Sequence, residues 1–248
     1  IGFFAFFNLF GSIVLLPIYL QTLMGYTSFL AGLVLGPGGL MSMIAMPIAG
    51  RLITKVNPKA ILLSGLSVTA YSIFLMSRFN LSADFNAVAW PRIVMGFGMG
   101  FLFIPLMTLS MSWVRKEDMG NAASIFNFTR TLGGSFGVAV ASTILARRMQ
   151  FHQAHLTTNM SFLDRNFQVA LPQVAQTLQE QGFAPALLDP GSLGVIYKGL
   201  LRQASMMAFN DTFYVLAVMM SCSIVLILLM RNSEHQKDEG VRKEIVLE

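Results

Sequence analysis

The sequence predicts an all-α fold, a polytopic membrane protein whose six spans form one helical bundle. Of its 248 residues, 54% are hydrophobic and only 12% are charged, whereas a soluble domain carries about 25% charged residues. No charged residue occurs between Ile1 and Ala49. About 20 helical residues cross the roughly 30 Å of bilayer hydrocarbon, so this stretch is too long for one span and predicts two. The composition excludes an ordinary soluble enzyme.

Long apolar runs predict the six spans at about 1–21, 28–50, 60–78, 87–112, 121–146 and 210–230. The first connection contains the turn residues Met24-Gly25-Tyr26-Thr27, and later connections contain Asn57-Pro58 and Asp118-Met119-Gly120, which break or cap helices. Residues 1–146 thus hold five spans, and 210–230 is the sixth. Since the chain begins inside a hydrophobic helix, without an initiator Met or a signal peptide pattern, we expect it to be a piece of a longer protein.

The placement of basic residues predicts the orientation, because Lys and Arg in short loops are retained in the cytoplasm. One side of the bundle holds nine of them: Arg51, Lys55, Lys59, Arg115, Lys116, Arg231, Lys237, Arg242 and Lys243. The two short connections on the other side, 21–27 and 79–86, hold none. The tail 231–248 is therefore predicted to be cytoplasmic. The net charge of +5 is explained by these loops, so nucleic-acid binding is not expected.

The segment 147–209 is predicted to be the one extramembrane module, on the far side of the membrane. Residues 166–182 carry apolar side chains at helical spacing, and 192–209 predict a helix that runs into the last span. A docking surface and a passive tether both remain open for this module. His152 and His155 are expected to be solvated loop residues, because a lone pair is too little for a metal site. With Cys222 as its one cysteine, the chain predicts no metal site and no cofactor.

Two arginines lie well inside predicted spans, where a charge costs at least about 2.5–3.5 kcal/mol. Arg130 is near mid-membrane and must face protein or water, whereas Arg92 is close enough to the surface to snorkel. The polar Asn127 and Arg130 continue a stripe of small residues, Gly134, Gly137 and Ala141. The stripe predicts close helix packing beside a cavity. A helix contact in which Arg130 bonds a neighbouring carbonyl is the structural alternative.

Other polar and small residues in the spans complete the set of candidates. Asn8 of the first span is a further candidate for the transport path. Asp211, at the mouth of the last span, is the nearest acidic residue to any span interior, so a proton-coupling acid is either Asp211 or, as we favour, a residue in the missing part of the longer protein. Small residues that allow close packing or gating accompany Arg92, namely Gly50, Gly96, Gly100, Gly133, Gly134 and Gly137. Spans interrupted by Gly and Pro favour a body that rearranges, as transporters do.

Several motifs resemble those of the major facilitator superfamily. Gly50-Arg51-Leu52-Ile53-Thr54-Lys55-Val56-Asn57-Pro58-Lys59 resembles a degenerate form of its loop signature, with Thr54 in place of the acidic residue and Asn57 in place of a glycine. Arg92 followed by Gly96-Phe97-Gly98-Met99-Gly100 resembles its fourth-helix motif, and Leu132-Gly133-Gly134-Ser135-Phe136-Gly137 resembles the glycine motif of antiporters.

More specifically, the chain resembles the EmrB/QacA group of fourteen-span drug:proton antiporters across all six spans. The resemblance rests on Leu16-Pro17-Ile18-Tyr19-Leu20-Gln21, on the stretch from Asn127 to Ser135, and on a long loop that ends at Asp211. It implies the C-terminal half of a multidrug exporter in the inner membrane, paired with a first half of the same polypeptide. In the EmrB branch it also implies a periplasmic membrane-fusion adaptor and an outer-membrane channel as partners, and small hydrophobic drugs as substrates.

Two rival functions remain open. A solute:proton symporter of the same superfamily would share the fold, and a self-sufficient six-span channel or membrane enzyme would act as this chain alone. The residues offer no paired-carboxylate or His-Glu constellation for an enzyme, so the prediction is a transporter that is not an enzyme.

Overall fold

The computed structural model describes residues 2–112, 114–158, 165–183, 185 and 188–229. Within these ranges the chain is helical and contains no strand, which confirms the all-α prediction. The helices are α1 (Gly2–Thr22), α2 (Ser28–Leu52), α3 (Pro58–Met76), α4 (Phe85–Met111), the short 3-10 helix η1 (Lys116–Asp118), α5 (Met119–Thr158), α6 (Arg165–Glu180) and α7 (Leu188–Leu229). The predicted cytoplasmic tail, 231–248, lies outside the described residues.

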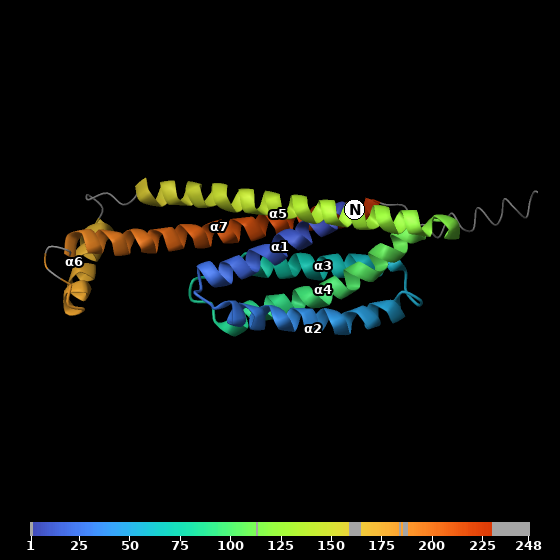
Figure 1. The fold of residues 1–248 in the computed structure, drawn as a ribbon, viewed down its shortest axis with the longest axis horizontal. Helices are drawn as coiled ribbons and strands as arrows, with labels where there is room; N and C mark the ends of the chain where they lie inside the picture. Colours follow the sequence, from blue (N-terminus) through green and yellow to red (C-terminus); the bar gives the residue numbers. More distant parts are fainter. Residues whose placement is uncertain (1, 113, 159–164, 184, 186–187, 230–248) are drawn as a thin grey trace, which may run out of the picture.

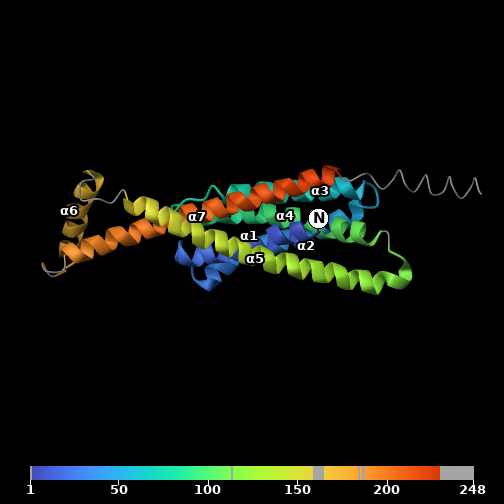
Figure 2. The same cartoon turned by 90° about the horizontal axis from the view of Figure 1, so that it is seen from above.

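Helices α1 to α5 and α7 run along a common direction, and α6 lies across one end of the molecule (Figure 1). The same end carries the outer parts of α5 and α7, which extend together beyond the other helices in both views (Figure 2). We call this end, built from α6 and the adjoining ends of α5 and α7, the hairpin extension. The connections with Arg51, Lys55, Arg115 and Lys116 belong to the opposite, basic end.

The first four helices begin and end within a few residues of the predicted spans, but α5 and α7 are much longer than predicted. Helix α5 continues to Thr158 instead of ending at about 146, and α7 begins at Leu188 instead of 210. At 1.5 Å per residue, a 40-residue helix is about 60 Å long, twice the thickness of bilayer hydrocarbon. The segment 147–209 therefore consists largely of the continuations of α5 and α7, with α6 between them.

Five of the described helices are long and apolar enough to cross a membrane: α1, α2, α3, α4 and α7. Helix α5, which covers the predicted span 121–146, does not qualify by length and composition. Its residues 121–146 include Asn127, Arg130 and many small or hydroxyl side chains, which dilute the apolar content. The count of six spans thus stays a prediction, supported by the position of α5 alongside α1 and α7 within the bundle (Figure 2).

Close backbone contacts at small residues hold the helices in pairs. Where α4 crosses α2, Gly96 lies so near Gly38 that an added Cβ would collide with the Gly38 carbonyl. Where α5 crosses α1, a Cβ on Gly133 would stand 2.6 Å from the Phe3 carbonyl oxygen, and one on Gly137 would collide with the Phe7 carbonyl. Such approaches replace side-chain packing by direct contact of helix backbones, which is a common way for membrane helices to associate.

The pairs assemble into two groups. Helix α4 packs extensively on α2 and α3, and α5 packs extensively on α1 and α7, whereas α4 and α5 touch each other over a short stretch. The groups are joined through α3 and α7, and the main core lies between them around Leu16, Tyr19 and Phe213. The short contact between α4 and α5 is therefore the natural place for a cavity between the two groups.

Candidate functional site

A cavity of about 260 Å³ lies between α4 and α5. Asn127 and Arg130, the two polar residues that the sequence places on one stripe of α5, both line it. They are three positions apart and therefore share one helix face. The remaining lining residues are apolar, and they are Phe103, Ile104, Met107 and Met111 of α4 with Ala123 and Phe126 of α5.

The cavity combines an apolar wall with one guanidinium and one amide. Phe103 and Phe126 are held in place by Phe6 of α1, whose ring centroid is 5.5 Å from that of Phe103 and 5.8 Å from that of Phe126. Phe6 itself is fully buried. Methionine side chains adapt to ligands of different shape, and aromatic faces accept flat or cationic groups. Arg130 and Asn127 are exposed in the structure, so their polar groups are free to meet a molecule that enters from solvent.

Asn8 does not line this cavity. Its side chain is fully buried in α1, and its Nδ2 donates a hydrogen bond of 2.9 Å to the carbonyl of Phe4, one turn earlier. Its Oδ1 is buried without a hydrogen-bond partner. A buried acceptor without a partner costs free energy, and native proteins contain few of them. The structure thus separates Asn8 from Asn127 and Arg130, with which the sequence grouped it.

Arg92 lies at the contact of α4 with α2. Its side chain is half-buried, its Nη1 donates to the sulfur of Met95 at 3.3 Å, and its Nε is buried without a partner. A Cβ added to Gly38 would stand 2.6 Å from the Arg92 carbonyl oxygen and 2.9 Å from Arg92 Cγ. The arginine therefore fills the space that Gly38 leaves open. By contrast, a Cβ on Gly50 would meet only Ile104 Cδ1 at 3.7 Å, an ordinary contact.

Of the other small residues predicted for packing, Gly100 faces Ala45 of α2 so closely that an added Cβ would collide with its side chain. Gly134 faces the ring of Phe10, with 3.0 Å from an added Cβ to Phe10 Cδ2. These positions lie at helix crossings, as expected from the small-residue spacing. A gating role for them stays a prediction.

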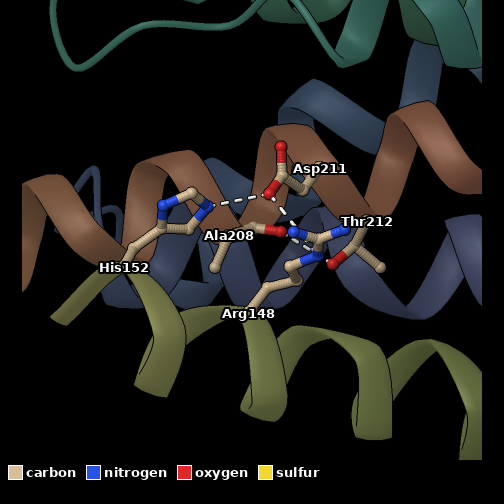
Figure 3. Close-up of polar contacts among 5 residues, drawn as sticks. All are labelled: Arg148, His152, Ala208, Asp211 and Thr212. Carbon is tan, nitrogen blue, oxygen red and sulfur yellow. Dashed lines mark hydrogen bonds and ion pairs between the residues drawn. The ribbon is translucent and has the colours of Figure 1, made fainter. Parts of the chain in front are cut away.

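A second polar site lies where α5 and α7 leave the bundle for the hairpin extension. His152 Nε2 is 2.7 Å from Asp211 Oδ2, and Arg148 Nε is 3.7 Å from the same oxygen (Figure 3). Arg148 and His152 are one turn apart on α5 and face α7, which carries Asp211. We call these three residues the outer charge cluster.

The burial of His152 corrects the prediction of a solvated loop histidine. Only 8% of its surface is exposed, because α5 continues through this region and places the ring against α7. His155 is exposed and stacks on the ring of Phe151, with the two rings nearly parallel. The i, i+4 spacing of Arg148 and His152 is a signal for a shared helix face. Their partner Asp211 is distant in sequence, so the cluster itself had no local sequence signal.

Two hydrogen bonds next to the outer charge cluster tie α7 and α1 to the connection between α3 and α4. Asn210 Nδ2 donates to the Phe79 carbonyl at 2.9 Å, and the Tyr19 hydroxyl of α1 donates to the Asn80 carbonyl at 3.2 Å. The Tyr19 ring stacks on Phe79, with ring centroids 5.4 Å apart. At the neighbouring residues Asn210 and Asp211, α7 is thus tied to the α3–α4 connection and to α5.

In the part of the chain that the structure describes, no group of three or more His, Cys, Asp and Glu residues could hold a metal ion. Cys222 is free and exposed.

Comparison with known proteins gives a family match. The family model described as Major Facilitator Superfamily matches residues 1–138. The chain is 32% identical over 221 residues to "Multidrug export protein EmrB" of Escherichia coli (strain K12), a match that covers 89% of this chain and 41% of the relative. It is 28% identical over 230 residues to "Fatty acid resistance protein FarB" of Neisseria gonorrhoeae, which covers 93% of this chain and 44% of that protein.

A third relative is "Colistin resistance protein EmrB" of Acinetobacter baumannii (strain ATCC 17978), 25% identical over 222 residues, with 90% of this chain and 43% of the relative covered. The chain thus spans about two fifths of the length of the curated relatives it matches.

Proposed function

Since this chain belongs to the major facilitator superfamily, we propose that it is the second helical bundle of a proton-coupled multidrug exporter. The exporter moves hydrophobic or amphiphilic compounds across the inner membrane by alternating access, together with a first bundle from the same polypeptide. The names of its relatives refer to multidrug export, to fatty acids and to colistin. Fatty acids and colistin differ in structure but share apolar parts. A single exporter for such compounds needs a site that recognises apolar bulk with few fixed polar contacts.

The observation that carries the proposal is the cavity between α4 and α5. It offers phenylalanine and methionine side chains from both helices together with Arg130 and Asn127. Methionine adapts its shape to irregular ligands, and binding surfaces rich in it accept many partners. We assign Arg130 and Asn127 to substrate contact and Arg92, with the small residues at the crossings, to packing and gating.

The division of the bundle into two groups supports alternating access. In this mechanism rigid groups of helices rock against each other about a site near the bilayer midplane. The backbone contacts at Gly38 and Gly96 and at Phe7 and Gly137 keep each helix pair rigid, while the cavity lies where the two groups touch least. A substrate bound there would contact both groups and be sensitive to their relative position.

The charge distribution supports an orientation with the basic end in the cytoplasm. Arg51, Lys55, Arg115 and Lys116 lie in connections at that end, and such residues are retained in the cytoplasm during insertion. The C-terminus would then be cytoplasmic, and the hairpin extension would project into the periplasm.

Expression of the full-length protein in a drug-sensitive strain should lower the steady-state accumulation of ethidium. A protonophore should restore accumulation to the level of cells without the protein, because it removes the proton gradient that drives export. The measurement is cell fluorescence with and without the protonophore, at equal membrane potential set by potassium and valinomycin. Gradient-dependent accumulation of a solute inside the cell would instead favour a symporter, and flux through residues 1–248 alone would favour a self-sufficient channel.

The hairpin extension is the proposed contact for a periplasmic membrane-fusion adaptor, which would connect the exporter to an outer-membrane channel. Helix α6 packs one face on α7, where Leu178 Cδ1 would lie 3.2 Å from a Cβ on Gly191. Its other face carries the exposed glutamines Gln173 and Gln176. This exposed polar face is available to a partner with hydrogen-bonding groups.

Replacing residues 159–187 by a flexible Gly-Ser linker should abolish co-purification of a co-expressed membrane-fusion adaptor. Helices α5 and α7 would keep their full lengths, so ethidium transport in proteoliposomes should persist. A second variant exchanges Gln173 and Gln176 for alanine, which preserves α6 while removing polar groups from its exposed face, and it should weaken adaptor binding. Adaptor binding that survives the linker replacement would assign the hairpin extension to another role.

A further inference from the structure

We propose that Asp211 and His152 form a proton-binding site where α5 and α7 leave the bundle for the hairpin extension, through which the pH on that side of the membrane controls transport. The inference rests on the proposed function as an exporter and adds the site at which protons from outside act. It is carried by the geometry of the outer charge cluster, in which a buried imidazole and a carboxylate from different helices share one hydrogen bond of 2.7 Å.

The chemistry of the pair suits a proton site. Histidine is the side chain whose ordinary titration falls between about pH 5 and 8, and neighbouring groups set the exact value. The hydrogen bond between His152 Nε2 and Asp211 Oδ2 places an imidazole nitrogen and a carboxylate oxygen, both groups that bind protons, 2.7 Å apart. His152 is almost fully buried, while 35% of the Asp211 side chain is exposed. Protons can thus reach the pair from solvent through the carboxylate.

The location of Asp211 distinguishes it from the other described acidic residues. Glu117 and Asp118 lie in η1 at the basic end, Glu180 and Asp189 lie in the hairpin extension, and Asp84 occupies the N-cap position of α4. Asp211 instead stands where the uncharged part of α7 begins, since no charged residue follows it up to Leu229. Those residues measure about 27 Å along a helix, close to the thickness of bilayer hydrocarbon. The pair therefore lies at the outer boundary of the membrane.

The groups that face the pair come mainly from α5. Arg148, with 47% of its side chain exposed, contributes a permanent positive charge at 3.7 Å from Asp211 Oδ2. From α1, the Tyr19 hydroxyl is directed to the Asn80 carbonyl, and from the end of α3, Arg78 lies over the Phe74 ring. Asp84 lines a separate hollow with Arg78.

The remaining ionisable groups on the two helices lie farther along them or at the surface. Arg202 is about two and a half turns from Asp211 along α7, and the exposed side chains are Arg147, His155 and Tyr214. A change of charge on His152 therefore acts most strongly on Asp211 and Arg148. With His152 charged, two cations flank one carboxylate, and with His152 neutral, only Arg148 does.

The pair is placed to influence the cavity through rigid elements. His152 and Arg130 lie on the same continuous helix, and Asp211 follows Asn210, which anchors α7 to the Phe79 carbonyl. A shift of the rigid α1–α5 pair against α7 at the outer charge cluster would therefore move the α5 wall of the cavity relative to α4. Proton binding at the pair is thus linked to the substrate cavity through helix movement, because α5 belongs to one helix group and α4 to the other.

The test measures ethidium transport by the full-length protein in proteoliposomes while the pH on the outer side is varied between about 5 and 8 and the pH difference across the membrane is held constant, so that the driving force does not change. Asp211→Asn and His152→Gln keep hydrogen-bonding groups but remove the titrating ones. Wild type should show a several-fold change of rate across this range, and each variant should lose that dependence while retaining activity at one end of it. The double variant should behave like either single variant, because the two residues act as one site.

His155→Gln is the matched control, since it removes an exposed histidine one turn away on the same helix, and it should retain the wild-type pH profile. Asp211→Glu keeps a titrating carboxylate and should retain a pH dependence. Wild-type pH profiles in Asp211→Asn and His152→Gln would overturn the proposal, and so would loss of activity at every pH in both, which a purely structural ion pair predicts.

A readout that needs no transport separates this proposal from the proposed function. The melting temperature of the detergent-solubilised protein should depend on pH, and His152→Gln and Asp211→Asn should change that dependence equally. If wild type shows this pH dependence but moves no ethidium, the exporter function is wrong while the proton site stands. If wild type exports ethidium and the melting profiles of wild type and variants coincide, the proton site is wrong while the exporter function stands.

Discussion

Replacing Arg130 by alanine is expected to reduce ethidium efflux of the full-length protein to the level of cells that lack it. Arg130 is the one charged residue that lines the cavity between α4 and α5 in the described part of the chain. A hydrogen bond to a charged group contributes about 1.5–3 kcal/mol, and the loss is larger where apolar walls exclude water. The measurement is the initial efflux rate, normalised to the amount of protein in the membrane by immunoblot.

The matched control is Arg147→Ala, which removes an exposed arginine of the same helix outside the cavity. It should leave efflux near the wild-type rate. Arg130→Lys should retain part of the activity, because lysine keeps the charge but loses the planar guanidinium with its fixed donors. Wild-type efflux in Arg130→Ala would reassign Arg130 to helix packing.

The largest effect on stability is expected from Gly96→Ala at the crossing of α4 with α2. The added Cβ would collide with the Gly38 carbonyl and stand 2.9 Å from Gly38 Cα. These are backbone atoms, so relief requires the two helices to move apart along their whole contact. Overpacking of a tight contact costs about 1–3 kcal/mol. We expect a lower melting temperature in detergent and reduced transport, because the α2–α4 pair would no longer move as one rigid group.

Gly36→Ala on α2 controls for the change in backbone freedom. An added Cβ at Gly36 meets no atom within 4 Å, so the substitution should be neutral or slightly stabilising, by up to about 1 kcal/mol. A melting temperature of Gly96→Ala equal to that of Gly36→Ala would show that α2 and α4 do not cross as closely as the structure has them.

Hydrophobic runs were sufficient to predict the bundle, because each bilayer crossing demands a long uncharged helix. The four helices up to Met111 end near the predicted positions for this reason. Helices α5 and α7 differ from their predictions: Asn127 and Arg130 lower the hydropathy of α5 inside the bundle, and both helices continue outward through polar residues, to Thr158 and from Leu188. Beyond the membrane a helix needs no apolar run, so its length depends on the contact with α7.

The sequence predicted the site residues that share one helix face. It did not predict those that come together only when distant helices pack in the fold. Asn127 and Arg130 face one cavity because helical spacing puts them on one side of α5. His152 and Asp211 meet only because two long helices leave the bundle side by side (Figure 2). Asn8 is a different case. We predicted it as a candidate for the transport path because it is a polar residue in a span, but its side chain is buried and donates a hydrogen bond to its own helix.

The measurement that tests the central claim most directly is ethidium flux in proteoliposomes that contain the purified full-length protein and an imposed pH gradient. A proton-coupled exporter predicts flux against the ethidium gradient while the proton gradient lasts, reversal of the flux when the proton gradient is reversed, and no gradient-driven flux in Arg130→Ala. Flux that is the same with and without the pH gradient, or that Arg130→Ala leaves unchanged, would contradict the account.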